Sequence, residues 1–211
     1  MPRPLPEHVR EATGGEAQAV REHILAAAYR VITVKGLAAA STRAIAAEAD
    51  IAAGTMYNYF DNHLQLIART LLWKIQKLSK PVSDLPQRAG KHTVAANLRH
   101  YARRIGPTLD ELVPLGAAAF SDPVLLEAMR VEHANVESIH DSVEILHNYL
   151  KQEQLLGRIA AGADCRAAAA VVFRICHDHA FHRFLEGSSF RIDAIARELD
   201  FVAKALVGED G

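Results

Sequence analysis

The sequence predicts an all-α protein. Apolar residues recur every three or four positions along most of its 211 residues, which is the spacing of one face of an α-helix. Only 6% of the residues are aromatic, and no segment shows the apolar–polar alternation of a half-buried strand. The length suits one large or two small domains and allows a sizeable core.

Composition and charge exclude several classes of protein. Lys and Arg number 24 against 25 Asp and Glu, a net charge of −1, so binding to nucleic acid needs a local surface. No apolar run reaches the roughly 18 residues of a membrane span, and the N-terminal segment lacks the apolar core of a secretory signal. Cys165 and Cys176 provide neither a disulfide framework nor a zinc ligand set. We therefore expect a cytoplasmic protein with no membrane partner.

The first elements are marked by their caps and stops. Residues 1–18 contain three prolines and two glycines, which predicts a mobile tail with one helical turn. A helix is expected from about Glu16 to Lys35, and Gly36 ends it because glycine adopts positive φ without steric cost. Ser41 or Thr42 caps a second, short helix. Asp50 lies in the turn after this helix, where aspartate tolerates the left-handed conformation.

Helices are predicted for the rest of the chain. A third short segment runs to Tyr59, and the next helix runs from about Asp61 to Ser79. Further helices are expected at 92–105, 108–119, 123–155, 164–186 and 193–207. Asp122 as N-cap and Pro123 in the first turn mark the start of the longest helix. We divide the chain into a tail (1–18), an N-terminal three-helix domain (19–64) and a C-terminal helical bundle (65–208).

Residues 19–60 carry the most specific pattern. Three short helices, the last two joined by a tight turn, are typical of a helix-turn-helix motif that binds DNA. The stretch STRAIAAEADIAAGTMYNYF (Ser41 to Phe60) resembles the N-terminal signature of the TetR family of transcriptional repressors. In that signature a capped Thr-Arg helix precedes a Gly-Thr-aliphatic-Tyr-x-Tyr-Phe recognition helix. The resemblance extends upstream through Ile24 and downstream through Leu66, whereas the C-terminal part matches only in helix count, length and order.

The resemblance implies a homodimeric repressor that binds a pseudo-palindromic DNA operator and is released by a small-molecule effector. Physical chemistry supports DNA contacts in the same stretch: Arg43 can reach a guanine edge or a phosphate, and an amide such as that of Asn58 can pair with adenine. Gly54 permits a close backbone approach, and Thr55 offers a hydroxyl. Taken singly, Thr42 is also explained as a cap and each tyrosine as a packing residue. The candidate DNA-binding residues are Thr42, Arg43, Ala53, Gly54, Thr55, Tyr57, Asn58, Tyr59 and His63.

Some positions depart from the family pattern. Ala52-Ala53 precede the Gly-Thr where the family usually has a pair such as Ser-Lys, and His63 stands where a lysine is common. Basic and acidic residues between 19 and 64 cancel, namely Arg21, Arg30, Lys35 and Arg43 against Glu22, Glu48, Asp50 and Asp61. We therefore expect few phosphate contacts per subunit, a shallow salt dependence and cooperation of two subunits.

Histidines on the C-terminal helices leave three alternatives open. His133, His140 and His147 recur every seven residues on or beside one predicted apolar face, and His177 shares such a face with Phe173. In the first alternative these histidines lie at the border of the core, in the second they anchor an organic ligand in a pocket, and in the third they bind a metal. Glu137-His140 and Glu144-His147 lie about 10 Å apart along one helix, too far for a two-metal site spanning ~4 Å. We expect no metal or cofactor and name Trp73, Phe120, His140, Phe173 and His177 as candidate ligand-binding residues.

The last two predicted helices are expected to form the homodimer interface. The helix over 164–186 is apolar on two sides and must bury both, and the last helix would complete a four-helix contact across a two-fold axis. A monomer with a well-covered bundle is the alternative. No nucleophile elbow, P-loop or dinucleotide fingerprint is present, so we expect no enzyme activity and no catalytic residue. The alternative function is a ligand-binding or interaction module on the same fold without operator binding.

Overall fold

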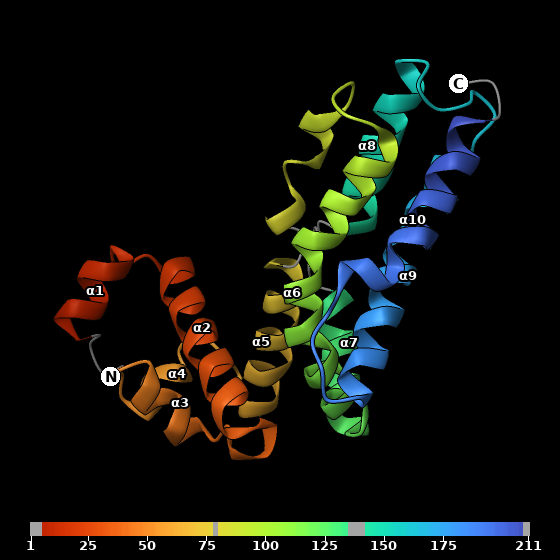
Figure 1. Ribbon diagram of the computed structural model, residues 1–211. Helices are drawn as coiled ribbons and strands as arrows, with labels where there is room; N and C mark the ends of the chain where they lie inside the picture. Colours follow the sequence, from red (N-terminus) through yellow and green to blue (C-terminus); the bar gives the residue numbers. More distant parts are fainter. Residues whose placement is uncertain (1–5, 78–79, 135–141, 209–211) are drawn as a thin grey trace. The chain divides into compact units, whose positions relative to one another are not determined.

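The computed structural model describes residues 6–77, 80–134 and 142–208. In these ranges the chain forms ten α-helices and three short 3-10 helices, with no β-strand (Figure 1). The prediction of an all-α protein is confirmed. The helices are α1 (Glu7–Thr13), α2 (Ala17–Lys35), α3 (Thr42–Glu48), α4 (Ala53–Met56), α5 (His63–Lys77), α6 (Val94–Phe120), α7 (Pro123–Ala134), α8 (Ser142–Leu155), α9 (Cys165–Leu185) and α10 (Ile192–Val207).

The chain divides into two compact units. One comprises residues 1–74 and 115–137, and the other comprises residues 75–114 and 138–211. The first unit therefore holds α1 to α4, most of α5, the end of α6 and all of α7. The second holds most of α6 together with α8, α9 and α10.

The core of the first unit is built on α2. The predicted apolar side of this helix is buried, including Val20, Ile24 and Val31, and Ile45 of α3 and Phe60 after α4 pack into the same cluster. Gly36 ends α2 as predicted: its φ is +83°, and its N–H donates to the carbonyl of Ile32. Ser41 is the N-cap of α3, and its hydroxyl accepts a hydrogen bond from the backbone N–H of Ala44 at 3.2 Å. The local signals in this segment thus match its structure.

The N-terminal segment is more ordered than the predicted tail. Residues Glu7–Thr13 form helix α1, and the side chain of Val9 is fully buried in the core of the first unit. The imidazole of His8 lies 2.9 Å from the carboxylate of Asp50. The helix is thus longer than the single turn expected here, and the buried Val9 packs it onto the core of the first unit. The mobility expected for the rest of the segment stays a prediction.

Helix α6 replaces the two helices expected at 92–105 and 108–119. Proline in a helix interior removes one N–H donor and crowds the carbonyl four residues earlier. Even so, α6 runs through both Pro107 and Pro114. Its buried side is continuous across the first of these positions, with Tyr101, Ile105 and Leu109 in the core of the second unit. Burial of this long apolar side offsets the helix-breaking effect of proline.

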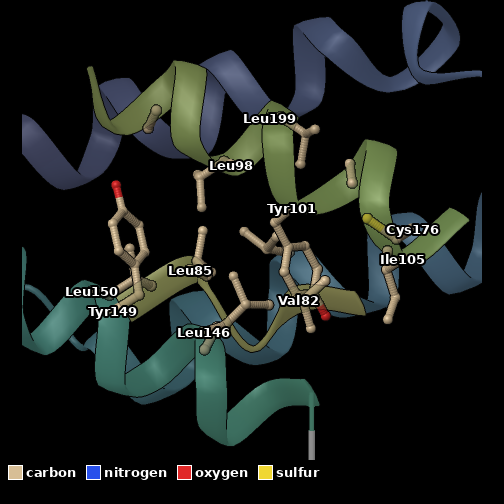
Figure 2. Packing of buried hydrophobic residues seen from close by; sticks show 14 of the residues in the cluster. Val82, Leu85, Leu98, Tyr101, Ile105, Leu146, Tyr149, Leu150, Cys176 and Leu199 are labelled. Carbon is tan, nitrogen blue, oxygen red and sulfur yellow. The ribbon is translucent and has the colours of Figure 1, made fainter. Parts of the chain in front are cut away.

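The second unit has a core of leucine, valine and tyrosine side chains. Figure 2 shows Leu98, Tyr101 and Ile105 of α6 together with Leu146, Tyr149 and Leu150 of α8. Val82 and Leu85, from the 3-10 helices Lys80–Val82 and Leu85–Arg88, pack into the same cluster (Figure 2). This core leaves one side of α9 and part of α10 uncovered in the described chain.

Two further expectations concern residues 123–155. The helix expected there is described as α7 and α8, and residues 135–141, with His140, lie outside the described residues. Asp122 caps α7, accepting hydrogen bonds from the backbone N–H groups of Val124 and Leu125.

Within the described ranges, no single helix has both the length and the apolar character of a membrane span. Helices α6 and α7 meet those criteria only as a bent pair.

Candidate nucleic-acid interface

The turn between α3 and α4 is held from several sides. Asp50 has a φ of +51°, the left-handed conformation expected for this position. The ring Nε2 of His23 on α2 donates to the carbonyl of Ala49 at 2.9 Å. Arg30 of α2 pairs with Glu48 at the end of α3, with Nε and Oε1 2.6 Å apart. These contacts fix α3 and the turn on α2, so the following helix starts from a defined position.

Helix α4 has one anchored side and one exposed side. Met56 and Phe60 are 2% and 3% exposed and pack in the core of the first unit, as expected from their spacing. Tyr57 is 58% exposed, and Asn58 and Ala53 also face solvent. Gly54 is exposed, and a Cβ added there would meet no atom within 4 Å. The exposed side therefore offers one phenol, one amide and an unobstructed stretch of backbone.

Arg43 supplies the positive charge next to this side. Its guanidinium is exposed on α3 and makes no hydrogen bond or ion pair with any described residue. Arg30, by contrast, is neutralised by Glu48. Although the formal charges of residues 19–64 cancel, the ion pair on α2 and α3 leaves Arg43 free to bind an anion.

A shallow depression brings three of the candidate residues together. Thr42, Tyr57 and His63 line it along with Met56, Phe60, Asn62 and Leu66. Tyr59, a further candidate, is half-buried against the core of the first unit. The start of α3, the end of α4 and the start of α5 thus meet at one surface, although the three residues are as many as 21 positions apart (63 − 42) in the sequence.

Thr55 does not fit the role predicted for its hydroxyl. The residue is 2% exposed, and its Oγ1 has no hydrogen-bond partner among the described residues. The single turn of α4 packs against α3, and Thr55 falls on the buried side next to Met56. The hydroxyl is therefore buried in this conformation, and its contact with a phosphate or a base stays a prediction.

His63 has a structural contact that the sequence did not indicate. Its ring Nε2 lies 2.6 Å from the carbonyl oxygen of Ala40. A carbonyl oxygen only accepts hydrogen bonds, so Nε2 carries the proton and donates it. The ring therefore ties the start of α5 to the segment that leads into α3, while the residue itself remains exposed.

Sequence reasoning also missed a polar network behind this surface. Glu132 on α7 is only 6% exposed and contacts Gln65 and Arg69 of α5. The partners are more than 60 residues apart in the sequence, so no local spacing could have indicated them. A large, mostly exposed groove beside the network has a volume of about 550 Å³ and is lined by residues of α5 and α7.

The candidate ligand-binding residues are only partly brought together. Phe173 and His177 are neighbours on α9, with ring centroids 6.1 Å apart, and His177 is exposed. Trp73 and Phe120 belong to the first unit instead, and Phe120 is 66% exposed. His140 lies outside the described residues. The pocket made by these five residues stays a prediction.

The other histidines and the cysteines add no metal centre to the described ranges. His133 is exposed, next to the buried Glu132 and four residues after Met129, which packs against the core of the first unit. No three His, Cys, Asp or Glu side chains of the described residues converge as metal ligands would. Burial raises the pKa of the Cys176 thiol to about 12, so this residue is a protonated core residue at neutral pH.

The site and fold define a helix-turn-helix protein with a helical C-terminal region. Residues 24–70 match the family model of the bacterial regulatory proteins of the tetR family. The resemblance seen in the sequence is confirmed: the chain carries a TetR-family N-terminal domain and has the fold of TetR-family transcriptional regulators. No curated protein sequence matches the chain.

Solved structures share this fold over nearly the whole chain. One, from Mesorhizobium loti and assigned to the TetR family, is 20% identical with a TM-score of 0.70, covering 90% of this chain and 96% of its own. A TetR transcription regulator from Haloarcula marismortui is 16% identical with a TM-score of 0.65, covering 90% and 100%. The transcriptional regulator FadR from Bacillus subtilis, in complex with stearoyl-CoA, is 19% identical with a TM-score of 0.57, covering 88% and 98%. At these identities the likeness concerns the fold.

Proposed function

We propose that this protein is a dimeric, ligand-released repressor that binds a pseudo-palindromic DNA operator through α3, α4 and the start of α5. The observation that carries the proposal is the two-sided character of α4. Met56 in α4 and Phe60 just after it are anchored in the core, while Tyr57 and Asn58 in the turn between them face solvent. Arg43 on the neighbouring α3 is exposed and makes no ion pair with any described residue. Exposed aromatic, amide and guanidinium groups on a rigid support suit contacts with base edges and phosphates.

Each exposed residue has a role in the proposed complex. Arg43 binds a guanine edge or a phosphate, and Asn58 pairs with an adenine. Tyr57 and Tyr59 direct their hydroxyls at the DNA backbone, and Thr42 contacts a phosphate at the start of α3. Gly54 and Ala53 allow the backbone of α4 to approach the major groove closely. His63 lines the same surface with an exposed ring and adds a packing contact with the DNA.

The second subunit is proposed to pack on α9 and α10. Val171, Phe181 and Leu185 of α9 are 41%, 40% and 66% exposed, and Phe201 of α10 is 74% exposed. Apolar side chains gathered on neighbouring helices favour burial against a partner. A copy of the same chain related by a two-fold axis would cover them and present two DNA-binding surfaces to the two halves of an operator.

The effector is proposed to be a small organic molecule bound by the C-terminal helices, without a metal or other cofactor. Solved proteins of this fold include one in complex with stearoyl-CoA and a multidrug binding protein complexed with imidazole. A ligand releases DNA only if it binds better to the conformation that does not fit the operator. A preference of about 1–3 kcal/mol gives a useful response. Phe173 and His177 remain the candidate contacts on α9.

Selection from a random duplex library tests the proposal. Protein incubated with the library at moderate salt should retain duplexes that share a two-fold symmetric motif. The double variant Arg43→Ala/Tyr57→Ala should lose this enrichment while keeping its helical signal and its dimer. A folded dimer that enriches no sequence at several salt concentrations would favour the alternative, a ligand-binding or interaction module that keeps the fold. Loss of DNA binding in this chain would then explain two features of its sequence, namely Ala52-Ala53 before the Gly-Thr and the cancelling charges of residues 19–64.

A further inference from the structure

A buried carboxylate on α7 holds the first turns of α5. Glu132 Oε1 accepts a hydrogen bond from Gln65 Nε2 at 3.0 Å, and Glu132 Oε2 accepts one from Arg69 Nε at 2.5 Å. The side chain of Glu132 is 8% exposed and that of Arg69 is 33% exposed. All three residues belong to the first unit, so these contacts form inside one compact part of the molecule.

Gln65 extends this network toward the helix-turn-helix. Its Oε1 accepts a hydrogen bond from the backbone N–H of Asp61 at 2.7 Å, and its Nε2 also donates to Asp61 Oδ2 at 3.0 Å. Its own backbone N–H donates to Asn62 Oδ1 at 2.8 Å. Both protons of the Gln65 amide are therefore used, one on Asp61 and one on Glu132. The position of Gln65 thus determines the conformation of the connection between Phe60 and α5.

Breaking the contacts of Glu132 is costly because its carboxylate is buried and its partners Gln65 and Arg69 are partly buried. A carboxylate buried to this degree needs charged or polar donors on both oxygens, and removing one partner leaves the other group unsatisfied. The start of α5 is therefore coupled to α7. His63 lies in this same turn and adds its contact with Ala40, at the entrance to α3.

We infer that Glu132 is a positioning residue for the DNA-binding surface. Through Gln65 and Arg69 it sets the orientation of Asn62 and His63, so the affinity for DNA depends on the position of this carboxylate on α7. Glu132 itself touches no DNA. The inference rests on the proposed function, and it adds a route by which a change at α7 reaches the DNA-binding residues.

The first test compares two carboxylates of α7. Glu132→Gln keeps the shape of the side chain but gives Arg69 an amide in place of a charged acceptor. We expect DNA affinity to fall about tenfold, the effect of one charged hydrogen bond, and backbone amides of residues 61–65 to exchange hydrogen faster. Glu127→Gln is the matched control, because Glu127 is exposed and pairs only with Arg130 on the same helix. This control should change affinity less than about twofold.

A second pair of variants separates positioning from general stability. Gln65→Glu places two carboxylates about 3.0 Å apart and should weaken DNA binding more than Glu132→Gln. The double variant Gln65→Glu/Glu132→Gln restores one amide and one carboxylate, and it sets the new carboxylate four residues before Arg69 on the same helix, a favourable spacing. We expect the double variant to bind DNA more tightly than Gln65→Glu and to exchange more slowly at residues 61–65, because the repulsion from Glu132 is removed. Recovery is partial, because the new carboxylate still faces Asp61 Oδ2, which accepts a hydrogen bond from Gln65 in the wild type.

Three results would overturn the inference. The first is Glu132→Gln matching Glu127→Gln in both affinity and exchange. The second is a double variant no better than its weaker parent. The third is a loss of affinity that follows the melting temperature alone, with no selective change at residues 61–65. If the wild-type protein retains no DNA sequence, the proposed function fails, whereas exchange at residues 61–65 still decides whether Glu132 positions this turn.

Discussion

The imidazole of His63 and the carbonyl of Ala40 join two segments that lie 23 residues apart, through a contact of 2.6 Å between Nε2 and the oxygen. Ala40 is 1% exposed, so its carbonyl has little access to water and depends on this donor. His63 begins α5, while Ala40 precedes the capped start of α3. One hydrogen bond thereby sets the spacing between two elements of the proposed DNA-binding surface.

The first prediction concerns this contact. His63→Ala should lower the free energy of unfolding by about 1 kcal/mol, because a buried acceptor loses its donor. His63→Gln should retain much of the stability, since a glutamine amide can donate from a similar position. Urea unfolding followed by circular dichroism measures both variants. Equal stability of His63→Ala and wild type would show that water replaces the ring without cost.

The second prediction concerns the salt dependence of DNA binding. Arg43 is the exposed, unpaired cation of α3 within the described ranges, so Arg43→Ala should reduce the slope of log affinity against log salt by about one per subunit. Arg130→Ala removes an exposed guanidinium on α7 that pairs with Glu127 of the same helix and serves as the control. Titrations of a selected duplex at several salt concentrations give the slopes. An unchanged slope for Arg43→Ala would place its guanidinium away from phosphates.

The third prediction concerns the packing of Phe190 on α6. A Cβ added at Gly106 would overlap Cδ1 of the Phe190 ring, closer than two carbon atoms can approach. Gly106→Ala should therefore destabilise the protein by about 1–3 kcal/mol, the usual cost of overpacking. Combining it with Phe190→Leu should recover part of the loss. Thermal unfolding of both variants tests this, and a stable Gly106→Ala variant would mean that the ring moves freely.

The fourth prediction concerns pH. Burial lowers the pKa of His179 below the ordinary histidine value of 6.5, and the charge of Arg183 adds to this effect. The folded protein therefore binds fewer protons at this site than the unfolded chain, so stability decreases as the pH falls below about 6.5. The ring Nε2 also accepts a hydrogen bond from the backbone N–H of Arg191 at 3.2 Å, which only an unprotonated nitrogen can do.

His179→Gln removes this titration and should flatten the pH dependence of unfolding between pH 7 and pH 5. His182→Gln serves as the control, because His182 lies on the same helix with an exposed side chain. The free energy of unfolding at each pH is the quantity to measure. A His179→Gln variant with the wild-type pH dependence would assign the effect to other groups.

The fifth prediction concerns α1. Val9 is fully buried in the first unit, so Val9→Ala should cost about 1–2 kcal/mol of stability through lost burial and the cavity left behind. Val34→Ala is the control, since Val34 is 79% exposed on α2 and should change stability little. Equal effects of the two substitutions would indicate that α1 does not pack on the core in solution.

The sequence by itself determined the local features of this protein. Its helical periodicity predicted an all-α fold, and the caps and stops at Ser41, Gly36 and Asp122 predicted where α3 begins, α2 ends and α7 begins. These features depend on contacts within one turn of the chain, so neighbouring residues are enough to specify them. The resemblance around Ser41 to Phe60 identified the helix-turn-helix for the same reason, because the motif is compact and continuous.

Tertiary structure decided what depends on residues far apart in the chain. Continuous burial of Tyr101, Ile105 and Leu109 carried α6 through Pro107, and the packing of α4 turned Thr55 inward. The contacts of His63 with Ala40 and of Glu132 with Gln65 and Arg69 span 23 to 67 residues, beyond any helical spacing. Propensity acts over a few residues, whereas burial and the pairing of buried polar groups depend on the whole folded unit. This is why the sequence located the helix-turn-helix motif and only the structure revealed the side chains that hold it.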